Sequence, residues 1–210
     1  MSSASVSYSP VDRSSRRPVA RRGGTSLRRL WPSDGPALRA FFLRLDAETR
    51  ASRFMASVGD RALADYAERA TVMSGMVVGV FVGGTLRALG ELRPFGSGAS
   101  GARRAEVALT VEQGFRRAGL GSMLLRRLTE AARNRGIAEL HLRCLPYNAA
   151  MRRLVMGFGA QMRLEEGENE GTIRLAQATP LSLWREGIET ALDFGLAVTA
   201  LPQLPLPRAA

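Results

Sequence analysis

The chain has 210 residues, of which 45% are hydrophobic, so it is long enough to bury a full core and is typical of one α/β domain. A single cysteine excludes an internal disulfide, and no apolar run is long enough to cross a bilayer. The N-terminus lacks the apolar segment of a signal peptide, so we expect a cytoplasmic protein. The net charge is +11, and every basic residue is an arginine.

Part of this charge lies in an N-terminal tail, residues 1–24, which carries five arginines against one aspartate, a net +4. Its Ser, Pro, Gly and Arg composition offers little to bury, which predicts disorder. No aromatic residues alternate with the arginines, so we expect no sequence-specific nucleic-acid binding. Charge alone would allow nonspecific contact with nucleic acid or an acidic partner, but we expect a solvated tail.

The first half of the domain begins with strand and helix signals in turn. Ser33 or Asp34 can cap the first helix. The expected elements are a strand over 25–31 and helices over 36–45, 47–54 and 60–69.

A strong hairpin signal follows, because Gly83-Gly84 separates two runs of strand-forming residues. These runs predict strands over 76–82 and 85–92. A glycine-rich loop over 94–101 and a further strand over 105–112 come next.

A strongly periodic helix then runs to Arg135, with leucines and alanine on one face and charged residues toward solvent. The apolar face is Leu120, Leu124, Leu128 and Ala131, and the expected solvent face is Arg126, Arg127, Glu130 and Arg133.

The last part predicts a strand over 139–145, a helix over 148–156 and a closing hairpin of 159–165 with 172–177. Residues 181–210 read as an amphipathic segment through Leu192 and a Pro-rich tail. Strands separated by helices in the middle and hairpins at both ends predict an α/β (α+β) fold: a mixed sheet with helices on both faces.

The most informative stretch is Arg116-Arg117-Ala118-Gly119-Leu120-Gly121-Ser122, between a strand and the periodic helix. Glycines at such a turn let a ligand approach the backbone. The free N–H groups and dipole of the following helix attract phosphate. The alternative is a glycine-assisted helix start with no ligand.

The spacing Arg-x-x-Gly-x-Gly, after a strand and before a helix, resembles the acyl-CoA pyrophosphate loop of the GNAT superfamily of N-acyltransferases. The likeness covers about residues 25–180 and includes an asparagine, Asn148, that heads the second helix. Residues 46–54 also resemble a segment of the branch that includes bacterial protein lysine acetyltransferases. The resemblance implies a mainly antiparallel central sheet with splayed central strands and an N-acetyltransferase domain over 25–180.

The resemblance also implies which residues bind acetyl-CoA as co-substrate. Backbone N–H groups of residues 116–122 meet the pyrophosphate, main-chain groups of Leu109 and Val111 pair with the pantetheine arm, and Asn148 completes the site. An N–H near Leu109 polarises the acetyl carbonyl. One histidine and one cysteine are too few for a zinc-type site, so we expect no metal.

Deprotonation of the acceptor points to Glu106. At pH 7 a lysine amine loses its proton at a cost of about 4.6 kcal/mol, and an α-amine at a cost of about 1 kcal/mol, so a lysine acetyltransferase profits most from a carboxylate base. Glu106 matches the place of the catalytic glutamate in protein acetyltransferases of this superfamily, and Glu91 is the reserve candidate. The alternative for Glu106 is a solvent-facing residue without a role.

One position departs from the usual enzyme pattern, and three other residues are expected to have structural roles. Many members carry a tyrosine, which protonates the leaving sulfur, where this chain has Val155. Tyr147 is close in sequence, but we expect it to pack on the helix cap. His141, without a visible partner, and Cys144, as a small apolar residue, are both expected to be structural.

The acceptor is the least determined part. Four carboxylates in 165–170, expected to form a turn beside the acceptor groove, favour a cationic amine or else form a solvated turn. Three functions remain open: acetylation of protein lysine, acetylation of a small amine, and a catalytically silent acetyl-CoA sensor. We expect a monomer or dimer that binds neither membrane nor specific nucleic acid.

Overall fold

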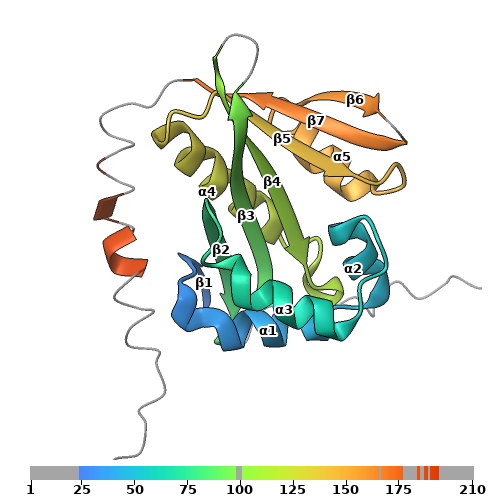
Figure 1. The fold of residues 1–210 in the computed structure, drawn as a ribbon, viewed down its shortest axis with the longest axis vertical. Helices are drawn as coiled ribbons and strands as arrows, with labels where there is room; N and C mark the ends of the chain where they lie inside the picture. Colours follow the sequence, from blue (N-terminus) through green and yellow to red (C-terminus); the bar gives the residue numbers. More distant parts are fainter. Residues whose placement is uncertain are drawn as a thin grey trace, which may run out of the picture.

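The computed structural model describes residues 24–97, 101–165, 167–176, 184, 187–188 and 190–193. Its centre is a seven-stranded sheet in the order β1-β2-β3-β4-β5-β7-β6 (Figure 1). All neighbouring strands are antiparallel except β4 and β5, which are parallel. The strands are β1 Thr25–Arg29, β2 Met76–Val82, β3 Thr85–Ser97, β4 Arg103–Val111, β5 Glu139–Cys144, β6 Gln161–Glu165 and β7 Glu168–Arg174.

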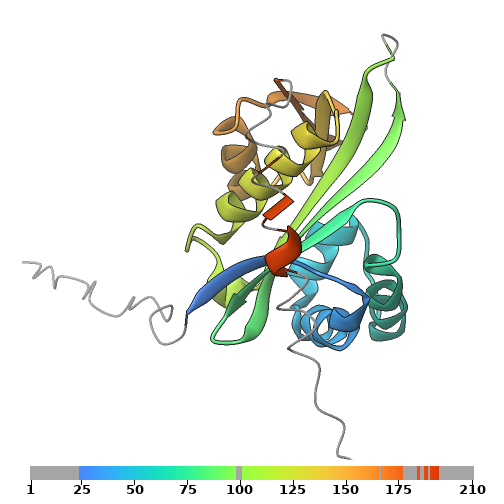
Figure 2. The same ribbon diagram turned by 90° about the vertical axis from the view of Figure 1, so that its left-hand side faces the viewer.

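Helices cover both faces of this sheet, as Figure 2 shows. One face carries three helices from the first part of the chain, and the other carries two from its second part. The first set is α1 Gly35–Arg44, α2 Ala47–Phe54 and α3 Asp60–Ala70; the second is α4 Leu120–Asn134 and α5 Ala149–Met156. The expected α/β architecture is confirmed.

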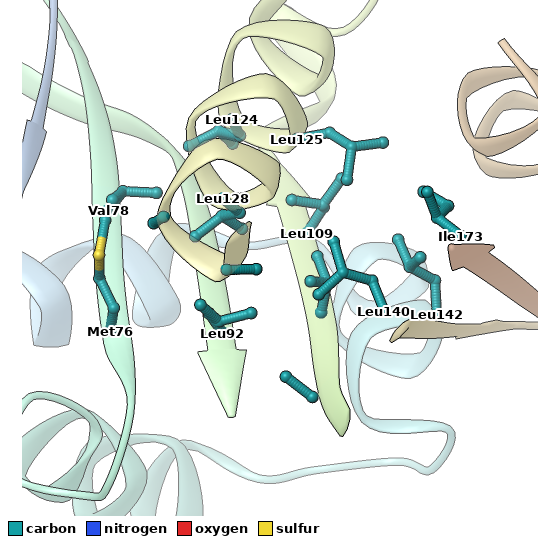
Figure 3. Close-up of a cluster of buried hydrophobic side chains, with 14 of the residues drawn as sticks. Met76, Val78, Leu92, Leu109, Leu124, Leu125, Leu128, Leu140, Leu142 and Ile173 are labelled. Carbon is teal, nitrogen blue, oxygen red and sulfur yellow. The ribbon is translucent and has the colours of Figure 1, made fainter. Parts of the chain in front are cut away.

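The larger core lies between the sheet and α4. Leu124, Leu125 and Leu128 of α4 point at the apolar side chains of the strands below (Figure 3). All three leucines are fully buried, and each stabilises the fold by about 1.5–3 kcal/mol of apolar transfer. The strands contribute Met76, Val78, Leu92, Leu109, Leu140, Leu142 and Ile173.

A second core lies under α1 and α3 on the opposite face. Phe41 and Phe42 of α1 are fully buried, and the ring of Phe42 meets that of Tyr66 edge-on, with centroids 5.4 Å apart. This cluster fixes α3 against the sheet, which matters for the site because Tyr66 reaches a buried charge on β3.

The elements follow one another in the expected order, but four details differ from the sequence expectation. Asp34 stands at the N-cap of α1 but makes no cap hydrogen bond: its carboxylate accepts from Trp31 N–H and from Arg28. Arg127 is buried, not solvent-facing, because its spacing from Leu120, Leu124 and Ala131 places it on the apolar stripe.

The other two differences concern strand lengths. β3 continues to Ser97 where a loop was expected from 94, since it keeps pairing with β4. β7 begins at Glu168, so the expected acidic turn contracts to a tight reversal at Gly167, whose φ is 81°. Residues 98–100 of the expected loop, residues 1–23 of the basic tail and the Pro-rich tail lie outside the described residues.

The feature that positions the site is a splay between β4 and β5. These strands pair only where Arg104–Glu106 meets Glu139–His141. Beyond that point Val107–Val111 and the end of β5 have no mutual pairing, so the sheet opens toward the loop before α4. The expected splayed central strands are confirmed.

Candidate active site

A cavity of about 850 Å³ occupies the splay. Its walls come from α2, β4, the loop before α4, the end of β5 and the start of α5. This volume lies in the range of cavities that bury a small-molecule ligand. The site therefore lies where β4 and β5 separate and leave the sheet open.

The loop at one end of the cavity has the backbone shape of an anion site. Arg117 and Gly119 both adopt the left-handed conformation, with φ of 65° and 82°. Left-handed residues in a turn gather successive N–H groups into a concave nest, and the N-terminus of α4 follows at Leu120. No protein atom lies within 4 Å of a Cβ built on Gly119, so its open side faces free space.

Sequence reasoning placed residues 116–122 at the pyrophosphate, and the structure brings all but Ala118 to the cavity wall. Packing also explains why residue 121 is a glycine, because a Cβ there would lie 3.2 Å from Leu154 Cδ2. Its missing side chain thus lets α4 and α5 approach, whatever binds in the cavity.

The edge of β4 that faces the splay carries free main-chain groups. Glu112 N–H donates to Arg87 O at 3.0 Å on the β3 side, and Ala138 N–H donates to Arg103 O at 2.9 Å on the β5 side. Because the main-chain N–H groups of a strand point alternately to its two edges, those of Leu109 and Val111 point toward the splay. Both residues line the cavity, as expected.

Arg116 ties the loop to α2. Its Nη2 donates to Thr49 Oγ1 at 2.6 Å, and Thr49 in turn donates to Asp46, the N-cap of α2, at 2.6 Å. Although burial opposes the effect, hydrogen bonds from Thr49 and the charge of Arg116 lower the pKa of Asp46. α2 is thus fixed against the loop before α4 through a chain of charge-assisted hydrogen bonds.

Glu106 lies on β4 at the other end of the cavity. Its side chain is 41% exposed and borders the cavity, and Arg143 Nη2 of β5 lies 3.5 Å from its Oε1. Val107 and Leu109 face α4, so alternation turns Glu106 toward α2. A carboxylate that is open to the cavity and only loosely paired is available as a proton acceptor.

Glu91, the reserve candidate, is in a different environment. Its side chain is 1% exposed, and its oxygens accept from Arg53 at 2.7 Å, Tyr66 at 2.5 Å and Arg93 at 2.9 Å. Burial raises the pKa of Glu91, but the two arginines and Tyr66 lower it overall. Both oxygens of Glu91 are occupied by hydrogen bonds and its pKa is lowered, which argues against Glu91 as the base.

The same cluster sets the protonation of its partners. Burial, with the charge of Glu91, raises the pKa of Tyr66 to about 12. The phenol therefore keeps its proton and donates a hydrogen bond to Glu91. Burial alone would lower the pKa of Arg53, but Glu91 above all, with Tyr66 and Glu106, raises it. Arg53 therefore stays a cation, and its side chain also lines the cavity.

The α5 side supplies the remaining expected residues. Asn148 lines the cavity and caps α5, its Oδ1 accepting from Met151 N–H at 3.0 Å. Val155 is in the core, so the usual tyrosine position offers no acid. Tyr147 does not pack on the cap as expected: it is 66% exposed and borders the cavity.

His141 has a partner that the sequence did not reveal, since its Nδ1 lies 2.6 Å from Glu170 Oε1. Among the described parts of 165–170, neither Glu168 nor Glu170 lines the cavity. The preference for a cationic acceptor beside the acidic turn therefore stays a prediction. Cys144 is buried as expected, and burial raises the pKa of its thiol.

Sequence reasoning missed three arginines of the cavity, Arg53, Arg143 and Arg153. Arg53 stands in the 46–54 segment, where only the family likeness was noted, and its position between Ser52 and Phe54 gave no chemical signal. Arg143 could have been found by alternation, since it lies two residues beyond His141, the β5 partner of Glu106.

Comparisons with known proteins agree with this geometry. Residues 40–159, more than half of the chain, match the acetyltransferase (GNAT) family. Among solved structures, the GNAT domain of S. lividans PAT is 23% identical, with a TM-score of 0.60 over 71% of this chain and 89% of that one.

Two further structures share the fold at lower identity. The yncA acetyltransferase of Salmonella typhimurium, solved with acetyl-CoA, is 16% identical over 74% of this chain and 96% of its own, with a TM-score of 0.56. The paia N-acetyltransferase of Thermoplasma acidophilum, solved with coenzyme A, is 15% identical over 72% and 99%, with a TM-score of 0.55.

Proposed function

Because the chain belongs to the GNAT family of acetyltransferases, we propose that it transfers the acetyl group of acetyl-CoA to an amine, with Glu106 as the base. One observation carries this proposal: a single cavity joins the left-handed phosphate loop, the free edge of β4 and a half-exposed carboxylate. Each of the three serves a different part of the reaction.

The described residues fit acetyl-CoA along the cavity. The nest of Arg117 and Gly119 and the first N–H groups of α4 suit the pyrophosphate. The N–H groups on the open edge of β4 suit the amides of the pantetheine arm, and the one at Leu109 suits the acetyl oxygen, where negative charge develops. Two structural neighbours solved with acetyl-CoA or coenzyme A support this fit.

In the transfer itself the amine nitrogen attacks the thioester carbonyl carbon, the C–N bond forms and the C–S bond breaks. Glu106 accepts the amine proton, directly or through a water molecule. The sulfur leaves as a thiolate and takes a proton from solvent. A thiol pKa near 8.5 makes it a tolerable leaving group, so the loss of the usual tyrosine at Val155 does not stop the reaction.

Protein lysine is the acceptor that we propose first, and the likeness to the GNAT domain of S. lividans PAT supports this choice. A small amine undergoes the same chemistry at the same residues. Because the two acceptors differ only in what surrounds the amine, a panel of lysine peptides and free amines distinguishes them. A silent acetyl-CoA sensor would bind the co-substrate and turn over none of the panel.

The test is Glu106→Gln, with Glu68→Gln on the exposed face of α3 as the matched control. Turnover on a good acceptor should fall about 10²-fold, the usual worth of a positioned base, while acetyl-CoA affinity stays unchanged. The loss should shrink at high pH, where the lysine amine arrives neutral. Parallel pH–rate profiles with equal rates would remove Glu106 from the mechanism.

A further inference from the structure

Arginine dominates the charge of the cavity. Among the described residues that line it are five arginines and two glutamates. Arg116, Arg117 and Arg153 belong to the phosphate loop and α5, at the end suited to the phosphates of acetyl-CoA. Arg53 and Arg143 remain at the acceptor end, beside Glu106.

Arg53 is a fixed cation of α2. Its Nη2 alone makes both of its hydrogen bonds, to Glu91 and to Tyr66, and its side chain is 14% exposed. Within the described part of the chain its Nε and Nη1 make no hydrogen bond. A guanidinium held at one edge in this way keeps donors available to a ligand in the cavity.

Arg143 of β5 is the exposed counterpart. Its side chain is 56% exposed, and the 3.5 Å between its Nη2 and Glu106 Oε1 exceeds the length of a charge-assisted hydrogen bond. An amine that binds Glu106 displaces this loose partner. The displaced guanidinium is then free to pair with a negative group of the same acceptor.

We infer that the acceptor carries an anionic group next to its reacting amine, and that Arg143 binds that group, with the charge of Arg53 adding to the field, while Glu106 binds the amine. A carboxylate matches the planar fork of a guanidinium. Two sources supply it: an acidic side chain beside a lysine in a protein, or the α-carboxylate of a free amino acid. This inference rests on the proposed function and names its substrate class.

The experiment compares acceptors that differ only in the anion. One arm uses the peptides acetyl-Gly-Asp-Lys-Gly-amide and acetyl-Gly-Asn-Lys-Gly-amide, and the other uses lysine and lysinamide. With saturating acetyl-CoA and low salt, we expect kcat/KM to be about tenfold higher for the carboxylate member of at least one arm, as for a hydrogen bond to a charged group. The arm that shows the preference identifies the source of the anion.

Variants connect the preference to Arg143. Arg143→Gln should raise KM for the preferred acceptor and abolish the preference, and Arg143→Glu should reverse it, with acetyl-CoA affinity unchanged in both. Arg126→Gln, on the exposed side of α4, should keep the preference. Turnover without a preference, or a preference that survives Arg143→Gln, overturns the inference and leaves the proposed function standing. No turnover of any acceptor, despite acetyl-CoA binding, overturns both.

Discussion

Glu91 is a buried carboxylate on a central strand, and its partners come from three separate segments. Arg53 reaches it from α2, Tyr66 from α3 and Arg93 from two residues further along β3. Burial of a charge is costly unless it is paired and fully hydrogen-bonded, and here both oxygens are satisfied. The cluster therefore holds α2 and α3 to the sheet and fixes Arg53 at the cavity.

Glu91→Gln should lower the free energy of unfolding by about 3 kcal/mol at pH 7, because it leaves two partly buried arginines short of a countercharge. The folded-state pKa of Glu91 is lowered, so its contribution is present above the unfolded pKa of about 4.3 and is lost as pH falls. Urea titrations at pH 7 and pH 3.5 should show the gap to wild type narrowing in acid. The exposed Glu68→Gln should change neither value, and an equal gap at both pH values would contradict this role.

Among single residues, the sequence predicted those that belong to one local pattern. It missed the contacts whose partners lie in other segments. Gly119 follows from the loop spacing, and Glu106 from its match to the family position on the strand before the loop, both local features. The partners of Glu91 and His141 could not be predicted, because Arg53 and Glu170 are 38 and 29 residues away from them. Such pairs depend on the register of the folded sheet, which no local pattern contains.

Among the elements, the loop before α4 combines conformational strain with ligand access. Gly119 and Gly84 both have positive φ, 82° and 74°, and a Cβ at either would meet no atom within 4 Å. They differ in place: Gly119 lines the cavity, and Gly84 lies in the turn between β2 and β3.

Gly119→Ala and Gly84→Ala should each cost about 1 kcal/mol of stability, the usual price of a left-handed non-glycine residue. Only Gly119→Ala should weaken acetyl-CoA binding, because its methyl group projects where the backbone must approach the pyrophosphate. Calorimetric titration of both variants checks this. Equal acetyl-CoA affinity in the two would mean that the loop does not bind the phosphates.

Most element boundaries were predictable because each element has its own local signal, and the exceptions have structural causes. The sequence suggested a loop from Pro94 because residues 94–101 are rich in glycine, and proline itself cannot donate a ladder hydrogen bond. β2 ends its pairing with β3 at Leu92, so from Pro94 onward one edge of β3 has no partner to lose, while β4 continues to pair with the other edge. Pairing with β4 thus continues β3 beyond the point where its local composition predicts an end.

In the whole molecule, the cavity joins parts that otherwise have little contact. α2 lies on one face of the sheet and α5 on the other, and the splay separates β4 from β5 between them (Figure 1). Among the described residues, β4 and β5 pair only where Arg104–Glu106 meets Glu139–His141. A ligand that fills the splay should therefore act as a missing strand and stabilise the molecule as a unit.

Acetyl-CoA at 100 times its Kd, which we expect to be micromolar, should add about 2.7 kcal/mol to the free energy of unfolding. For a domain of this size that corresponds to a rise in Tm of roughly 5–11 °C. Glu106→Gln should gain the same rise, since the base does not hold the co-substrate, and Gly119→Ala should gain less at the same concentration. Hydrogen exchange should locate the added protection at β4, the start of α4 and the end of β5. A Tm rise without protection at β4 would mean that the ligand binds outside the splay, and both the loop and the strand edge would then lose their assigned roles.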